Sequence, residues 1–290
     1  MNRLIMDMHT HSSFSPDAAD SAELMYKRAS EIGLSYYALT DHCDCNFWYP
    51  VEHYKRDNIP QDDMMMYGSG KYSIDSITEQ KRLKEHLKSK LNGVKIIIGI
   101  ELGQPLQDIE NAETIASDKD LDFIIGSHHQ NRGENDFYYL KYDSMTKAEI
   151  YKLLDDYFEQ MLEMCKWGKF DVLGHLTYPL RYICGEYGID IDLSSYDEII
   201  REIFKTIINN VKGIEINTSG LRQKYGKTFP DEKYVRLYKE LGGEIITVGS
   251  DAHCVKDLGK GISEGIELAE TAGFKYLACF EKHKPEFIKI

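Results

Sequence analysis

The order of segments along the chain constrains its fold more than any other feature of the sequence. Short, strand-like apolar segments alternate with longer segments in which apolar residues recur at helical spacing. The strand-like segments are Leu4–Met8, Tyr36–Thr40, Lys95–Ile100, Asp122–Ser127, Asp171–Gly174, Gly213–Asn217, Glu244–Val248 and a candidate eighth at Phe274–Cys279. The helical segments lie near 21–32, 74–91, 105–118, 146–168, 194–210, 231–241 and 257–272. This alternation favours a parallel sheet, because parallel strands need crossover connections.

Seven or eight such units of uneven length are more typical of a closed or distorted (β/α) barrel than of an open doubly wound sheet. The 290 residues are an ordinary length for one barrel, and no glycine-rich nucleotide motif, internal repeat or linker divides them. We therefore expect one α/β domain over residues 1–290. Residues expected to cap the helix N-termini are Asp20, Ser73, Thr146, Ser194 and Asp231.

Charge and composition exclude several classes of protein. The formal net charge is −13, which argues against non-specific binding to nucleic acid phosphates. We expect no membrane span, because no run of about 18 apolar residues is present. The beginning of the sequence lacks the basic and apolar regions of a signal peptide, and the six cysteines are scattered. These features predict a cytoplasmic protein with reduced thiols.

Imidazole and carboxylate side chains follow the predicted strands one after another. They are His9, His11 and Asp17, then Asp41 and His42, Glu101, His128 and His129, His175, Glu215, and finally Asp251 and His253. In a (β/α) barrel the carboxyl ends of all strands lie on one face, where active sites are built. We therefore expect these side chains around a single mouth. His9 and His11 are two residues apart, so in an extended chain both point to the same side.

Such a set of ligands predicts a metal centre. Imidazole and carboxylate together suit Zn, Mn or Fe, and the set exceeds the four ligands of one tetrahedral ion. We therefore expect two or three divalent ions. Without cations, the clustered carboxylates would repel one another and raise each other's pKa. Several dications would also make one pocket of an acidic protein electropositive, which suits a small phosphate ester as substrate.

The motifs, taken in this order, resemble those of a known family. With Thr40-Asp41-His42, Gly99-Ile100-Glu101, Gly174-His175-Leu176 and Gly249-Ser250-Asp251-Ala252-His253, the sequence resembles the polymerase-and-histidinol-phosphatase (PHP) superfamily. Within it, the sequence looks most like the monofunctional histidinol-phosphate phosphatases, from residue 5 to residue 253. The resemblance implies a distorted, TIM-like (β/α)7 barrel with a trinuclear metal site. It also implies hydrolysis of L-histidinol phosphate in histidine biosynthesis, by metal-activated hydroxide attack on phosphorus.

The resemblance also implies how the ligands are shared among three ions. One ion would be held by His9, His11, Glu101 and Asp251; a second would share Glu101 and add His129 and His175; a third would take Asp17, His42 and His253. The family pattern after the fourth strand is Ser-x-His, which selects His129 over His128.

Roles in the reaction follow in part from these positions. Glu101 would bridge two ions, and the candidates for assisting departure of the alcohol are Asp17, His253 or a water on the third ion. Arg181 and Arg222 both fall on the active face, where each could bind phosphate bidentately or form a surface salt bridge. Two connections, 43–72 and 130–145, exceed simple turns, and such loops are usually lids, binding loops or disordered segments.

Three other functions remain open from the sequence. The chain could be another PHP-type phosphoesterase that acts on nucleotides or another small phosphate ester. It could be an amidohydrolase-like C–N hydrolase, which also begins with His-x-His, although no strand end here supplies the lysine that those enzymes typically use. It could also be a non-enzymatic metal-sensing or storage module.

Overall fold

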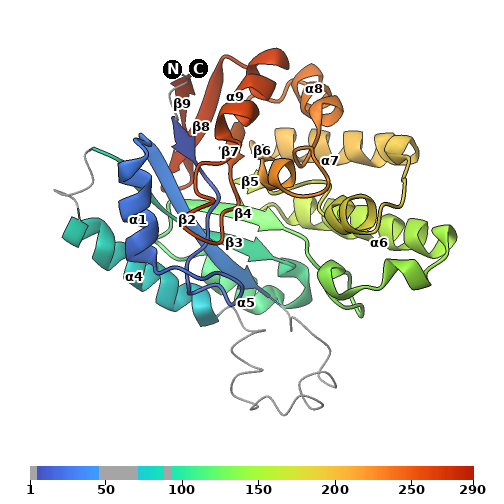
Figure 1. Ribbon diagram of the computed structural model, residues 1–290, viewed down its shortest axis with the longest axis horizontal. Coiled ribbons are helices and arrows are strands. Elements are labelled where there is room, and N and C mark those ends of the chain that lie inside the picture. The colour runs from blue at the N-terminus through green and yellow to red at the C-terminus, as the bar shows by residue number, and fades with distance from the viewer. Residues whose placement is uncertain (1–4, 46–70, 88–92) are drawn as a thin grey trace, which may run out of the picture.

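Seven parallel strands organise the computed structural model, which describes residues 5–45, 71–87 and 93–290 (Figure 1). Each strand pairs with the next in chain order: β1 (Met6–Asp7), β2 (Tyr36–Asp44), β3 (Lys95–Gly103), β4 (Phe123–Ser127), β5 (Val172–Leu173), β6 (Gly213–Asn217) and β7 (Ile246–Gly249). The first and last strands meet at a seam, where the Met8 amide donates to Val248 O at 3.0 Å and the Asp251 amide to His9 O at 2.7 Å. The sheet is thus a distorted seven-stranded barrel, which confirms the predicted fold class.

The helices follow the expected pattern. They are α1 (Ala22–Glu31), α4 (Lys71–Leu87), α5 (Ile109–Ala116), α6 (Lys147–Trp167), α7 (Asp197–Asn209), α8 (Glu232–Glu240) and α9 (Ile262–Thr271). Within the described ranges, none of them is long and apolar enough to cross a membrane.

The helix caps explain where several of these elements begin. Thr146 forms a capping box with Glu149, and the side chain of Asp231 accepts from the amide of Lys233, as expected. Three expected caps were wrong. Ser21, not Asp20, caps α1; α4 begins before Ser73; and a 3₁₀ turn, Leu193–Tyr196, takes up Ser194 before α7 starts.

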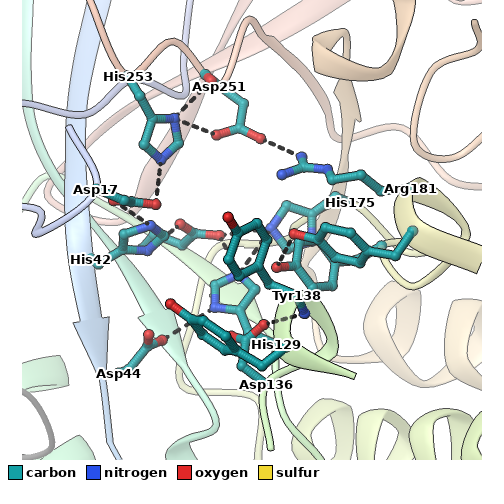
Figure 2. Close-up of a pocket in the computed structure, with 14 residues that line it drawn as sticks. Asp17, His42, Asp44, His129, Asp136, Tyr138, His175, Arg181, Asp251 and His253 are labelled. Atoms are coloured by element: carbon teal, nitrogen blue, oxygen red, sulfur yellow. Dashed lines mark hydrogen bonds and ion pairs between the residues drawn. The ribbon is translucent and has the colours of Figure 1, made fainter. Parts of the chain in front are cut away.

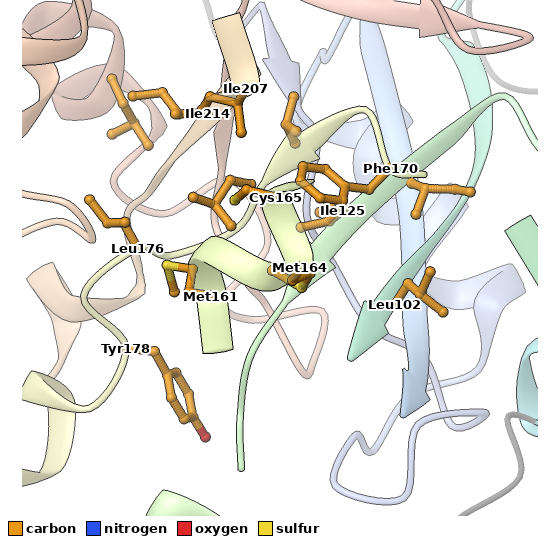
Figure 3. Packing of buried hydrophobic residues seen from close by; sticks show 14 of the residues in the cluster. Leu102, Ile125, Met161, Met164, Cys165, Phe170, Leu176, Tyr178, Ile207 and Ile214 are labelled. Carbon is orange, nitrogen blue, oxygen red and sulfur yellow. The ribbon is translucent and has the colours of Figure 1, made fainter. Parts of the chain in front are cut away.

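The packing of α6 on the sheet shows how the barrel positions its strands (Figure 3). Met161, Met164 and Cys165 of α6 are buried in the same core cluster as Ile125 of β4 and Phe170. Gly126 has no space for a side chain, because a Cβ would lie 2.6 Å from the Phe170 ring. Close packing at this point fixes β4 and the residues that follow it.

A C-terminal hairpin covers the end of the barrel opposite the strand carboxyl ends. Strands β8 (Tyr276–Glu281) and β9 (Lys284–Lys289) pair antiparallel in a sheet of their own, so the candidate eighth strand does not join the barrel. The Phe280 ring stacks on Phe123 at 4.9 Å, and His283 Nδ1 lies 2.9 Å from Asp171 Oδ2. Phe123 begins β4, and Asp171 directly precedes β5.

Candidate metal centre and active site

The carboxyl ends of the strands bring the predicted ligands together. Four sets have ligand atoms within 4.8 Å of one another: His9, His11 and Asp251; Glu101, His129 and His175; His42, Asp44 and His129; and His11, His42 and His253. Asp17 joins the last set, because its oxygens lie 3.5 Å from His42 Nε2 and 3.1 Å from His253 Nε2. β2 and β3 extend further than expected, to Asp44 and Gly103, so His42 and Glu101 are part of regular strands.

Carboxylates behind two of the histidines orient their rings. Nδ1 of His9 donates to Glu215 Oε1 at 2.7 Å, and Nδ1 of His129 to Asp44 Oδ1 at 3.2 Å. Carboxylates commonly fix metal-binding imidazoles in this way. With its proton on Nδ1, each neutral ring presents the lone pair of Nε2 to the cluster.

The Nε2 atoms of these rings face other ring nitrogens, and their distances show whether the site fits a metal ion. His9 Nε2 lies 3.1 Å from His11 Nε2, and His129 Nε2 lies 3.2 Å from His175 Nε2. His11 also has a partner at Nδ1, because Ser15 Oγ lies 3.2 Å away. At such distances two ring nitrogens repel each other unless a proton or a metal cation lies between them. The donor set therefore fits divalent metal ions.

Glu101 lies at the centre of the cluster and is 1% exposed. Its Oε1 is 2.7 Å from His175 Nε2 and 3.1 Å from His129 Nε2. Its Oε2 lies 2.9 Å from His42 Nδ1 and 3.3 Å from His9 Nε2, yet within the described part of the chain this buried oxygen makes no hydrogen bond of ordinary geometry. A carboxylate whose two oxygens face different ligand sets is suited to bridge ions.

The pKa values show how strongly these groups depend on one another. Burial raises the pKa of Glu101, but the neighbouring imidazoles of His9 and His129 outweigh it and hold that pKa well below its usual range. Burial lowers the pKa of His129, but Glu101 and Asp44 outweigh it and raise the value to about 10. In the metal-free centre, protons on imidazoles therefore supply the positive charge that the carboxylates require.

Asp41 and His128 lie outside the cluster, although both follow predicted strands. The carboxylate of Asp41 accepts from the hydroxyls of Ser12, Ser15 and Ser76 at 2.9, 2.8 and 2.6 Å, and so holds the loop before Asp17. His128 is directed away, with Nε2 3.0 Å from Asn131 Oδ1, and burial lowers its pKa to about 4.

A cavity of about 370 Å³ lies over the ligand cluster (Figure 2). Besides predicted ligands, its walls are formed by polar and aromatic side chains: Asp44, Asp136, Tyr138, Tyr139, Tyr178, Arg181 and Tyr182. The loop at 130–145, expected to be a lid, binding loop or disordered segment, is ordered and supplies three of these residues. The other long connection lies mostly outside the described residues.

The two predicted arginines occupy different positions. Arg181 lines the cavity, and its Nη2 donates to Asp251 Oδ2 and Ser219 Oγ, both at 2.8 Å. Arg222 is not part of the cavity lining. It donates to the carbonyls of Ser250 at 2.5 Å and Asp251 at 2.6 Å. Asp251 has a φ of 52°, so Arg222 holds the backbone at a strained residue of the cluster.

Sequence reasoning missed the roles of three acidic residues of this site. Asp44 could have been found, because it lies two residues after His42 in an extended strand and so shares its side of the sheet. Glu215 was noted at a strand end but was not expected to orient His9. Asp136 lies in an irregular loop and has no periodic signal.

Comparisons with known proteins agree with this geometry. The sequence profile of the PHP domain family matches residues 7–219. A probable histidinol-phosphatase of Thermotoga maritima is 27% identical over 274 residues, covering 94% of this chain and 95% of that protein. A histidinol-phosphatase of Lactococcus lactis is 29% identical over 295 residues, and the alignment covers 96% of this chain and 95% of that protein.

A solved structure extends the comparison to three dimensions. The crystal structure of histidinol phosphate phosphatase from Lactococcus lactis, complexed with zinc, L-histidinol and phosphate, aligns with a TM-score of 0.69 and 26% identity. The alignment covers 98% of this chain and 99% of that one. Profile, relatives and ligand geometry agree, and the chain belongs to the PHP domain family.

Proposed function

We propose that this protein is a metal-dependent phosphatase that hydrolyses L-histidinol phosphate to L-histidinol and phosphate, a step of histidine biosynthesis. The observation that carries the proposal is the convergence of the predicted ligands beneath a cavity that also contains Arg181. Relatives aligned over almost their whole length are named histidinol-phosphatases, and one solved relative contains zinc, L-histidinol and phosphate. On this proposal, residues 1–290 act as one PHP-type domain.

We assign the metal ligands as the family motifs arrange them. His9, His11, Glu101 and Asp251 would hold one ion, Glu101, His129 and His175 a second, and Asp17, His42 and His253 a third. Such ions, whether Zn, Mn or Fe, lower the pKa of bound water and offset the charge of a phosphate. Among these ions we favour zinc, because the solved relative contains it.

The remaining roles belong to the chain's own residues. Arg181 is already oriented by Asp251 and Ser219, so its guanidinium would bind a phosphate oxygen with little loss of side-chain freedom. Asp17 and His253 lie at the outer edge of the cluster, so one of them, or a water on the third ion that they would hold, would assist departure of the alcohol. Arg222 would act on substrate mainly by holding Asp251, because backbone carbonyls occupy its guanidinium.

The alternatives fit the cavity less well. No lysine is found in the described cavity lining, which disfavours an amidohydrolase-like C–N hydrolase. A storage or sensing module does not require an arginine that is oriented beside the proposed ligands. Another PHP-type phosphoesterase, acting on nucleotides or another small ester, would share the ligands and Arg181, so activity has to decide between them.

The first experiment compares substrates with zinc- or manganese-loaded protein. We expect the highest kcat/KM for histidinol phosphate in a panel that also contains nucleoside monophosphates and a dipeptide. His9→Ala and Glu101→Ala should abolish the activity and reduce bound metal, measured by elemental analysis. Preferred hydrolysis of a nucleotide or of the dipeptide would contradict the proposal, as would full activity of either variant.

A further inference from the structure

We propose that Asp136 binds the ammonium group of the substrate and selects phosphate esters whose alcohol carries a primary amine. This inference rests on the proposed phosphatase activity and adds a specificity residue to it. It concerns the wall of the cavity opposite Arg181, to which the sequence assigned no role.

The position of Asp136 leaves its carboxylate open to a ligand. It lies between β4 and α6, directly before the 3₁₀ turn Phe137–Tyr139, and its Oδ1 accepts from the Tyr138 amide at 2.7 Å. Within the described residues this is the hydrogen bond that the carboxylate makes, and the side chain lines the cavity (Figure 2).

The other acidic residues of the described lining already have partners within the protein. Asp17, Glu101 and Asp251 belong to the proposed ligand set. Asp44 accepts from His129 Nδ1 and orients that ring. Asp136 is the acidic side chain of the described lining that neither the ligands nor their supporting groups use.

Charge is arranged across the cavity in the order that such a substrate requires. Arg181 and Asp251 lie together on one side, while Asp44 and Asp136 lie on the other (Figure 2). An ester whose phosphate contacts the ligand cluster and Arg181 therefore extends toward a carboxylate. An ammonium there would form a charge-assisted hydrogen bond.

The surroundings of Asp136 strengthen its interaction with a cationic partner. Burial and the nearby carboxylate of Asp44 raise the pKa of Asp136 to about 6, although His129 partly opposes them. A carboxylate that is partly shielded from water gains more from an ammonium than a fully exposed one does. The rings of Tyr138 and Tyr139 line the same part of the cavity and can contribute cation–π contacts.

The experiment uses Asp136→Asn, because the asparagine oxygen can still accept from the Tyr138 amide and preserve the turn. We would measure kcat and KM for histidinol phosphate and for its deaminated analogue, which has a hydrogen in place of the amino group. The variant should raise KM for histidinol phosphate by about 10- to 100-fold, as expected for a lost hydrogen bond to a charged group. KM for the analogue and both kcat values should change by less than about twofold, in line with a uniform binding contact.

The matched control is Asp143→Asn, an exposed aspartate of the same loop, which should leave all four constants unchanged. An equal loss on both esters would overturn the proposal, since it would mean that Asp136 holds the loop, contacts the imidazole or transfers a proton. Unchanged constants in Asp136→Asn would overturn it as well.

The two proposals can fail separately. If the wild-type protein prefers a nucleotide, histidinol phosphate is not its substrate, and the amine proposal falls with that assignment. If the wild-type protein prefers histidinol phosphate over the analogue and Asp136→Asn keeps the same preference, only the role of Asp136 is rejected.

Discussion

At the scale of single residues, His128 and His129 show how adjacent side chains take different environments. The Nε2 atom of His129 faces Glu101 and His175, whereas that of His128 faces Asn131. A change of one position along the chain therefore separates a proposed ligand from a structural residue.

We predict opposite outcomes for the two histidines. His129→Gln should lower kcat/KM by at least about 100-fold and reduce bound metal, because losing even an outer-shell partner typically costs about 10- to 100-fold. His128→Gln can keep a hydrogen bond to Asn131 and should retain both metal and activity. Parallel kinetics and elemental analysis make the comparison, and a metal-depleted His128→Gln would contradict the assignment.

Much of the site's composition could be predicted because strands repeat every two residues and all end on one face. That rule places His9 and His11 on one side and brings Glu101 and Asp251 to the same mouth. It does not reach Asp136, whose position depends on the path of an irregular loop. Nor does it decide that Asp41 binds serine hydroxyls, because this requires knowing which segments pack around it.

At the scale of elements, β7 approaches β6 and the segment after β1 closely enough to require a glycine. A Cβ on Gly249 would lie 2.3 Å from His9 Cβ and 2.5 Å from Glu215 Oε1. The hydrogen bond between His9 and Glu215 therefore depends on the lack of a side chain at Gly249.

Gly249→Ala should therefore impair the metal centre from outside the ligand set. We expect zinc affinity to fall at least about tenfold, because the substitution displaces the pair of His9 and Glu215. Gly33→Ala is the control. Its φ of +78° with open space around it predicts a loss of roughly 1–2 kcal/mol of folding stability without a change in affinity. Isothermal titration of both variants tests this, and equal affinities would reject it.

Element types were predictable from periodicity, but some ends and the last hairpin were not. The turn between β8 and β9 consists of Lys282 and His283, both with positive φ, at 50° and 62°. Such turns usually contain Asn or Gly, so the sequence gives no hairpin signal there. Contacts of His283 with Asp171 and of the Lys282 amide with Asp122 help to hold this unfavourable backbone.

At the scale of the whole molecule, metal binding is linked to pH. His9, His129 and His253 have raised pKa values, since the effect of nearby carboxylates exceeds that of burial. A raised pKa means that these imidazoles hold their protons to a higher pH in the metal-free protein, and His129, with a pKa of about 10, keeps its proton at neutral pH. Each proton must leave before its nitrogen can bind a cation.

We therefore predict that zinc uptake by chelated protein releases protons and strengthens as pH rises. Between pH 6 and pH 8 the dissociation constant should fall about tenfold per pH unit for each proton displaced. Titrations in buffers of different ionisation enthalpy would count the protons. An affinity that does not vary over this range would show that the imidazoles are already deprotonated.

The barrel seam joins residues that lie far apart in the sequence. His9 comes long before Asp251 in the chain, yet its carbonyl accepts from the Asp251 amide. During synthesis a nascent chain therefore lacks one proposed ligand of the first ion until Asp251 has been added. On this assignment, the complete centre can take up its metal only after that point, and a chain truncated before Asp251 would not form it.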